Sequence, residues 1–289
     1  MRIFLTVICL CYSALCYFQM KEITADAEVA EERRVVHLSV DDVEAFFDLI
    51  RREEQFPSLF DHPFFGYLKQ LHEKSGMKVT LYTYETLGTD SLRSVPSRYR
   101  KELRENAGWL KIGFHWPRPE FKEGISAESF RRSYENVSEA ICDMADSTLL
   151  APALRLHYFY GPDSLLRSVE KWPVLLTADD EHRPSYDLSP SQRERLNRSG
   201  SIQSGSRRYV KTDMRIEGHL NMRHRLRALG HPDTLVIFTH EWALTPQPMK
   251  RVAATLIYNR RLQCSALNRR NLELTLRWLG EHKYDYTFL

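Results

Sequence analysis

The chain has 289 residues, of which 43% are hydrophobic and 27% charged, enough to bury one large core. Its formal net charge is only +3, so no overall electrostatic field points to a nucleic-acid partner. One segment, residues 191–230, is locally basic, with ten Lys and Arg residues against three acidic ones. This segment is either a solvated loop or a surface that contacts an anionic sugar or phosphate.

The first residues have the pattern of a targeting segment. An uncharged apolar run over residues 3–18 follows Met1 and Arg2, and it is short for a membrane span. We therefore expect a signal segment at 1–18, a polar linker at 19–33, a single domain at 34–289 and no stable membrane span in the mature chain. A working leader would place the protein outside the cytoplasm, in the periplasm or cell envelope or secreted; without one the protein would be cytoplasmic. Beyond the leader only Cys142 and Cys264 remain, which allow one disulfide but no cysteine zinc site.

Short apolar runs alternate with helical patterns along the chain, beginning with a buried strand at 35–40 and an amphipathic segment from Val43 to Ile50. This alternation predicts an α/β fold with a mostly parallel sheet, open or closed into a barrel. We expect residues 187–230 to form long loops with one strand near 209–216. The remaining predicted elements, in chain order, are a helix at 65–74, strands at 78–84 and 110–114, a helix at 130–144, strands at 154–156, 174–177 and 235–239, and helices at 249–262 and 272–281.

Side chains able to bind metal or move protons follow five of the predicted strands. Because the carboxyl ends of parallel strands meet at one edge, we expect these side chains to share a pocket. They are Asp41 and Asp42, His115, His157, Asp179 and Asp180, and His240 with Glu241.

Each of these residues also has a structural interpretation. Asp42 could be the N-cap of the helix that follows it. His115 and His157 could be packed core residues, and Asp179 and Asp180 could be turn residues. The set nevertheless suits hydrolysis of an ester or amide, since a divalent ion held by imidazole and carboxylate activates water while Asp and His move protons.

The order of these motifs resembles that of the polysaccharide deacetylase superfamily, over roughly residues 35–242. The matching motifs are an apolar strand ending in Asp41 and Asp42, the sequence Gly-Phe-His ending at His115, an Arg-containing strand end at Arg155, and an apolar strand ending in His240.

This resemblance implies a distorted (β/α) barrel that hydrolyses N- or O-acetyl groups on a saccharide with a bound divalent metal, zinc being the expected ion. It further implies Asp41 as general base, Asp42 and His115 as metal ligands, Arg155 as the residue that orients the base, and His240 as general acid.

The chain departs from the family pattern at one ligand, because Pro119 stands where a second histidine normally follows His115. We expect His157 to replace that ligand, with Glu120 as the second candidate. Sugar rings could stack on aromatic residues beside the strand ends. The predicted substrate-binding residues are Trp116, Tyr158, Asp179, Asp180 and Trp242.

Two other functions fit the same residues. A glycoside hydrolase on a related barrel would pair Asp41 with Asp179 or Glu217. A catalytically inactive protein could keep the pocket and only bind carbohydrate.

Overall fold

The computed structural model describes residues 33–169, 174–179, 183, 185–246 and 265–289. Residues Val35–Leu289 form one compact unit. The predicted leader, the linker up to residue 32, the predicted helix at 249–262, Asp180 and Cys264 all lie outside the described residues. Across the described residues, no helix has both the length and the apolar character that a bilayer crossing requires.

The strands form a mostly parallel arrangement, which confirms the predicted α/β class. Their bounds are β1 Val35–Val43, β2 Val79–Tyr84, β3 Thr86–Leu87, β4 Asp90–Ser91, β5 Leu110–Trp116, β6 Ala153–Leu154, β7 Val174–Leu176, β8 Ser201–Ser204, β9 Arg207–Val210, β10 Met214–Arg215, β11 Thr234–His240 and β12 Asp285–Tyr286.

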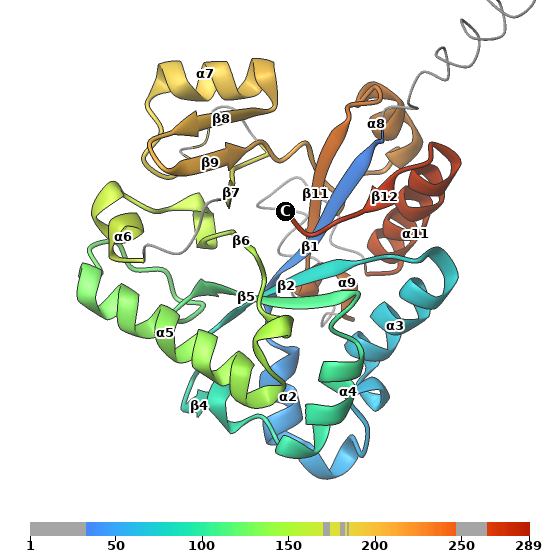
Figure 1. The fold of residues 1–289 in the computed structure, drawn as a ribbon. Coiled ribbons are helices and arrows are strands. Elements are labelled where there is room, and N and C mark those ends of the chain that lie inside the picture. Colours follow the sequence, from blue (N-terminus) through green and yellow to red (C-terminus); the bar gives the residue numbers. More distant parts are fainter. Residues whose placement is uncertain (1–32, 170–173, 180–182, 184, 247–264) are drawn as a thin grey trace, which may run out of the picture. The chain divides into compact units, whose positions relative to one another are not determined.

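The larger sheet has the strand order β10-β11-β1-β2-β5, with β12 paired to β1, and all of these pairs are parallel (Figure 1). A second sheet has the order β6-β7-β9-β8 and is parallel except for the β8–β9 hairpin. A bridge between Ile112 of β5 and Leu150 links the larger sheet to the segment just before β6. The carboxyl ends of β1, β2, β5 and β11 therefore lie along one edge.

Helices pack around the strands, as Figure 1 shows for α3, α5 and α11. The long helix α5 buries Phe130, Val137 and Ile141 on one face, and the Ser126 hydroxyl accepts the amide of Ser129 at its first turn. The helix bounds are α2 Ala45–Arg51, α3 Pro63–Ser75, α4 Arg100–Glu105, α5 Ala127–Met144, α6 Asp163–Ser168, α7 Pro190–Ser199, α8 Met222–Ala228, α9 Glu241–Leu244 and α11 Ser265–Glu281.

A glycine in the middle of β5 allows a side chain of β2 to pack closely against it. A Cβ atom on Gly113 would lie 2.7 Å from the ring of the buried Tyr82, whose hydroxyl donates to the carbonyl of Ala153 at 2.9 Å. Glycine at 113 therefore lets the β2 tyrosine reach across to β6.

The expectation of long loops at 187–230 is wrong. Helix α7 begins at Pro190 after a capping box formed by Ser189 and Gln192, and Asn221 caps α8. Between them lies the β8–β9 hairpin. These helix-start signals are local, but the segment has few apolar residues, so its hydrophobic pattern did not predict the two helices.

Two predicted boundaries also differ from the structure. Val43 is the last residue of β1 rather than part of a helix, and α2 starts at Ala45 after Glu44 as N-cap. The N-cap interpretation of Asp42 is therefore wrong. The strand expected at 154–156 ends at Leu154, so Arg155 and His157 belong to an irregular turn.

Candidate metal and catalytic centre

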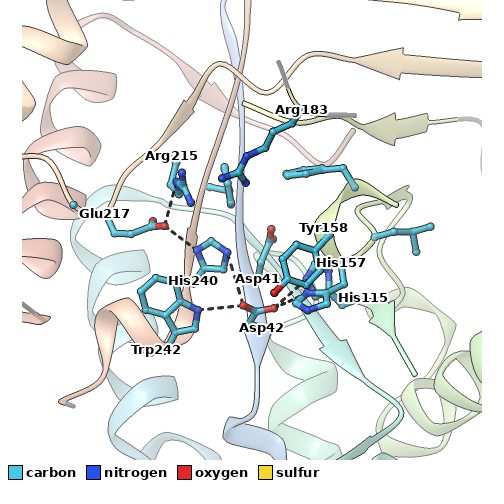
Figure 2. A pocket seen from close by; sticks show the side chains of 14 residues that line it. Asp41, Asp42, His115, His157, Tyr158, Arg183, Arg215, Glu217, His240 and Trp242 are labelled. Atoms are coloured by element: carbon cyan, nitrogen blue, oxygen red, sulfur yellow. Dashed lines mark hydrogen bonds and ion pairs between the residues drawn. The ribbon is translucent and has the colours of Figure 1, made fainter. Parts of the chain in front are cut away.

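A cavity of about 590 Å³ opens at the carboxyl ends of β1, β5 and β11 (Figure 2). It brings together side chains that the sequence predicted at separate strand ends. Its lining residues are Asp41, Asp42, His115, Leu156, His157, Tyr158, Phe159, Arg183, Arg215, Glu217, Gly218, Phe238, His240 and Trp242.

The two aspartates occupy the last residues of β1, where its pairing changes. Asp41 lies opposite His240 in the parallel register with β11. The register with β2 shifts between Val40 and Val43, and Asp42 adopts a left-handed backbone conformation with φ 55°. Aspartate tolerates this conformation better than most residues, but it remains strained, and such strain is concentrated at functional sites.

Asp42, His115 and His157 form a compact cluster. The Oδ1 atom of Asp42 lies 3.2 Å from Nε2 of His115 and 3.1 Å from Nδ1 of His157. The two imidazole nitrogens are 3.2 Å apart. Three donor atoms from β1, β5 and the turn after β6 thus form a nearly equilateral triangle. Among the described residues, this is a group able to hold a metal ion.

The hydrogen bond on the far side of His115 fixes which nitrogen faces the cluster. Nδ1 of His115 lies 2.7 Å from the backbone carbonyl oxygen of Arg155. A carbonyl oxygen only accepts, so Nδ1 carries a proton, and Nε2 is the nitrogen directed at Asp42, where a neutral ring would present its lone pair. Two acceptors that face each other repel unless a cation lies between them.

The triangle has the size that a tetrahedral ion requires. Nitrogen and oxygen ligands about 2.0–2.1 Å from zinc lie about 3.3 Å from one another. The observed separations of 3.1–3.2 Å agree with that spacing. The donor set therefore fits a divalent ion, with Asp42, His115 and His157 as the residues that would hold it.

Two further side chains donate hydrogen bonds to the Asp42 carboxylate. Its Oδ1 accepts the Tyr84 hydroxyl at 2.5 Å, and its Oδ2 accepts the Trp242 indole N–H at 3.1 Å. Burial alone would raise the pKa of Asp42, but its close contacts with the His115 and His157 rings outweigh burial and hold the pKa well below its ordinary value. Asp42 is therefore an ionised carboxylate, as a metal ligand must be.

Asp41 lies deeper than Asp42 and has a cationic neighbour. Its Oδ1 is 3.6 Å from Nε of the fully buried Arg155 and accepts the Ser39 hydroxyl at 3.3 Å. Burial raises the pKa of Asp41, while Arg155 opposes that shift. The guanidinium of Arg155 also stacks 4.6 Å above the ring of Phe238 and donates to Thr212 at 3.1 Å. The Arg155 guanidinium therefore stabilises the charged form of the Asp41 carboxyl.

His240, the last residue of β11, is paired with a buried carboxylate. Its Nδ1 lies 2.8 Å from Oε1 of Glu217, and its Nε2 lies 3.8 Å from Oδ2 of Asp42. Burial would lower the pKa of His240, but the Glu217 carboxylate outweighs it and raises the pKa to about 9. The hydroxyl of Thr239 donates to the other oxygen of Glu217 at 3.0 Å. His240 is therefore protonated at neutral pH.

Three other predicted site residues lie away from the cluster. Trp116 is buried and packs on Phe121 and Phe130 rather than lining this cavity. Asp179 sits behind the cavity, where its Oδ2 lies 3.6 Å from Nε of Arg215. Glu120 lines a separate cavity of about 430 Å³. Tyr158 and Trp242 do line the larger cavity, whereas Asp180 lies outside the described residues.

Sequence reasoning missed two partners of the site. Tyr84 is the last residue of β2, but the strand-end pattern covered only carboxylates and imidazoles and not phenols. Glu217 directly follows the strand expected near 209–216, whereas the sequence indicated it only as a glycosidase carboxylate and not as the partner of His240. A strand-end rule that includes tyrosine and the strand near 209–216 finds both residues.

No protein-family model matches the sequence, and no curated protein is significantly similar to it. Solved structures with a similar fold include carbohydrate esterase family 4 proteins. One is the Xyl-CE4 domain of a multidomain xylanase from the hindgut metagenome of Trinervitermes trinervoides (12% identity, TM-score 0.48, 88% of this chain and 87% of that one). Another is a family 4 acetyl xylan esterase from Clostridium thermocellum with a bound cobalt ion (12%, 0.47, 88% and 87%).

The fold is also similar to that of a 4-α-glucanotransferase from Thermococcus litoralis, at 11% identity and a TM-score of 0.53, over 88% of this chain and 39% of the other. This likeness supports the α/β fold alone. Activity must be argued from the site itself.

Proposed function

We propose that the protein is a metal-dependent hydrolase that removes an acetyl group from a saccharide. The observation that carries this proposal is the triangle of donor atoms from Asp42, His115 and His157, with sides of 3.1–3.2 Å. A divalent ion at this site would activate water and polarise the acyl carbonyl. Two imidazoles and a carboxylate are ligands that suit zinc.

In this proposal Asp41 is the general base. It lines the cavity beside Asp42, and burial raises the pKa of its carboxyl, which makes the carboxylate a better proton acceptor. Arg155 keeps the carboxylate charged and oriented. In the proposed reaction Asp41 takes a proton from water as the water oxygen bonds to the acyl carbon.

In this proposal His240 is the general acid. Because Glu217 raises its pKa to about 9, the ring carries a proton to give at neutral pH. The bond between the acyl carbon and the sugar oxygen or nitrogen breaks, and that atom takes the proton from His240. The products are acetate and the deacetylated saccharide.

Two aromatic side chains favour a sugar as the group that carries the acetyl. Tyr158 is 64% exposed although it lines the cavity, and Trp242 lines it next to His240. Aromatic rings with one polar edge are suited to stack on sugar faces. The motif order that resembles polysaccharide deacetylases favours acetyl as the leaving acyl group.

The glycosidase alternative loses support in this geometry. Glu217 is engaged by His240 and Thr239, and Asp179 lies next to Arg215 outside the cavity lining.

The test is to measure bound metal and acetate release in three proteins. We expect the parent protein to hold about one divalent ion and to release acetate from acetylated xylan or an N-acetylglucosamine oligomer. Asp42→Ala should lose both metal and activity, whereas Asp41→Asn should keep the metal and lose acetate release. A parent protein that binds no divalent ion, or one whose activity survives chelation, would contradict the proposal. A parent protein that binds saccharide but never releases acetate would instead favour the inactive carbohydrate-binding alternative.

A further inference from the structure

Two arginine side chains, Arg183 and Arg215, line the same cavity as the metal-ligand cluster. Figure 2 shows both guanidinium groups on the side of the cavity away from His115 and His157. The aspartates of the cavity have nearer partners elsewhere: Asp41 lies beside Arg155, and Asp42 lies within the histidine cluster. The two arginines are therefore not required to neutralise either aspartate.

Arg215 is held in a fixed position. Its Nε lies 3.5 Å from Glu217 and 3.6 Å from Asp179, and only 13% of its side chain is exposed. Both of these contacts are made at Nε. Within the part of the chain that the structure describes, the two Nη atoms of Arg215 donate no hydrogen bond. A guanidinium whose Nε contacts carboxylates can still bind a ligand through its two Nη atoms.

Arg183 reaches the cavity from a different segment. Its backbone carbonyl accepts a hydrogen bond from Arg193 of α7 at 2.9 Å, which ties this residue to the first turn of that helix. The exposed side chain extends toward the cavity, and its guanidinium lies on the same side as that of Arg215 in Figure 2. Two guanidinium groups from separate segments thus face one space that is also large enough for a sugar.

A guanidinium fork matches the paired oxygens of a carboxylate or a phosphate, and such contacts are stronger than neutral hydrogen bonds. A divalent ion at the cluster would add further positive charge to the cavity, which favours an anionic ligand. We propose that the saccharide substrate is anionic and that Arg183 and Arg215 bind its carboxylate or phosphate. This inference rests on the proposed function, because it assigns the substrate class of that site.

The test measures binding of matched acetylated sugars to the full, metal-loaded chain by calorimetry at low and at physiological salt. The probes are N-acetylglucosamine, which is neutral, N-acetylmuramic acid, which adds a carboxylate, and N-acetylglucosamine 6-phosphate. We expect at least one charged probe to bind about tenfold more tightly than the neutral sugar, with a preference that weakens as salt rises. The charged probe that binds more tightly distinguishes a carboxylate from a phosphate substituent.

Two variants and one control assign the preference to the arginines. Arg183→Gln, at an exposed position, should remove most of the preference without affecting folding, and Arg215→Gln should do the same. Arg195→Gln, an equal charge change on the exposed face of α7, should leave the preference intact.

Equal binding of charged and neutral sugars, or a preference that persists in both variants, would overturn this inference. Release of acetate from the neutral sugar in that case would leave the proposed function standing. A charge preference without acetate release would instead uphold the anion site and count against the hydrolase. If no probe binds at all, the anion site and the saccharide function fail together.

Discussion

The two sheets supply the site in different ways. In the larger sheet, β1 and β11 pair without interruption from Val35 opposite Thr234 to Asp41 opposite His240. In the second sheet, β6 pairs with β7 over only two residues, and the chain then leaves the sheet at Arg155. The first region places Asp41 and His240 through a long regular register. The second region places Arg155 and His157 through a short strand and an irregular turn.

The irregular region also holds backbone strain. Tyr158 and Phe159, which follow His157 in the turn His157–Phe159, both have φ 54°, a conformation that costs non-glycine residues on the order of 1–2 kcal/mol each. Such a turn persists only where packing enforces it. The regular sheet thus fixes Asp41 and His240, whereas the strained turn brings His157 to Asp42 and His115.

The largest effect should come from removing the ligand that the irregular turn supplies. We expect His157→Ala to weaken metal binding by more than about 100-fold, as much as His115→Ala, because each removes one of three protein ligands. Bound metal after dialysis measures this directly. Glu120→Ala is the matched control, since Glu120 lines another cavity. Loss of metal in Glu120→Ala with retention in His157→Ala would reverse the assignment of the third ligand.

A smaller effect, of about 10- to 100-fold in kcat/KM at alkaline pH, should follow Glu217→Gln in the regular region. Without the carboxylate the pKa of His240 falls from about 9, because burial then acts without opposition. A general acid is inactive above its pKa, so the alkaline limb of the pH–rate profile should move to lower pH. An alkaline limb that stays in place would show that His240 is not the acid.

The pairing of His240 with Glu217 also makes the unfolding free energy depend on pH. The pKa of His240 is raised from 6.5 to about 9 in the folded protein. Its contribution to stability is therefore fully present below pH 6.5 and is lost as the pH rises toward 9. We expect the unfolding free energy of the metal-free parent to fall over that interval, and the fall to be reduced in Glu217→Gln. Urea titrations at several pH values measure this slope.

An intermediate effect is expected at the junction of β11 with β1. The carboxylate of Glu241 accepts the backbone amides of Glu44 and Ala45, at 2.7 and 2.8 Å, just after Asp42. Glu241→Ala removes the acceptor of both amides, including that of the buried Ala45, and should lower the unfolding free energy by about 1–3 kcal/mol. Glu241→Gln keeps one acceptor oxygen and should lose less. Equal losses in urea denaturation would show that these hydrogen bonds contribute little.

The smallest effect should come from Tyr158 in the strained turn. Since Tyr158 is 64% exposed and its φ is 54°, Tyr158→Gly should leave stability unchanged or raise it by up to about 1 kcal/mol. Tyr158→Ala removes the same ring without relieving the backbone, so it should be the less stable variant. Both should bind saccharide a few-fold more weakly. A glycine variant less stable than the alanine variant would show that the turn is not strained.

The sequence determined the fold class and the strand-end positions of Asp41, Asp42, His115 and His240, because apolar runs and helical periodicity are local properties of the chain. It also ranked His157 ahead of Glu120 as the expected replacement ligand. The helices at 190–199 and 222–228 were missed despite local cap signals, since few apolar residues mark them.

Tertiary structure alone decided which of these side chains meet. The pairing of His240 with Glu217 and of Asp42 with Tyr84 joins residues from neighbouring strands, and it depends on strand order and register. The burial of Trp116 against α5 and the approach of Arg183 to Arg215 depend on how separate segments pack. A single sequence carries no direct record of distances between segments, so these contacts become visible only once the sheet is assembled.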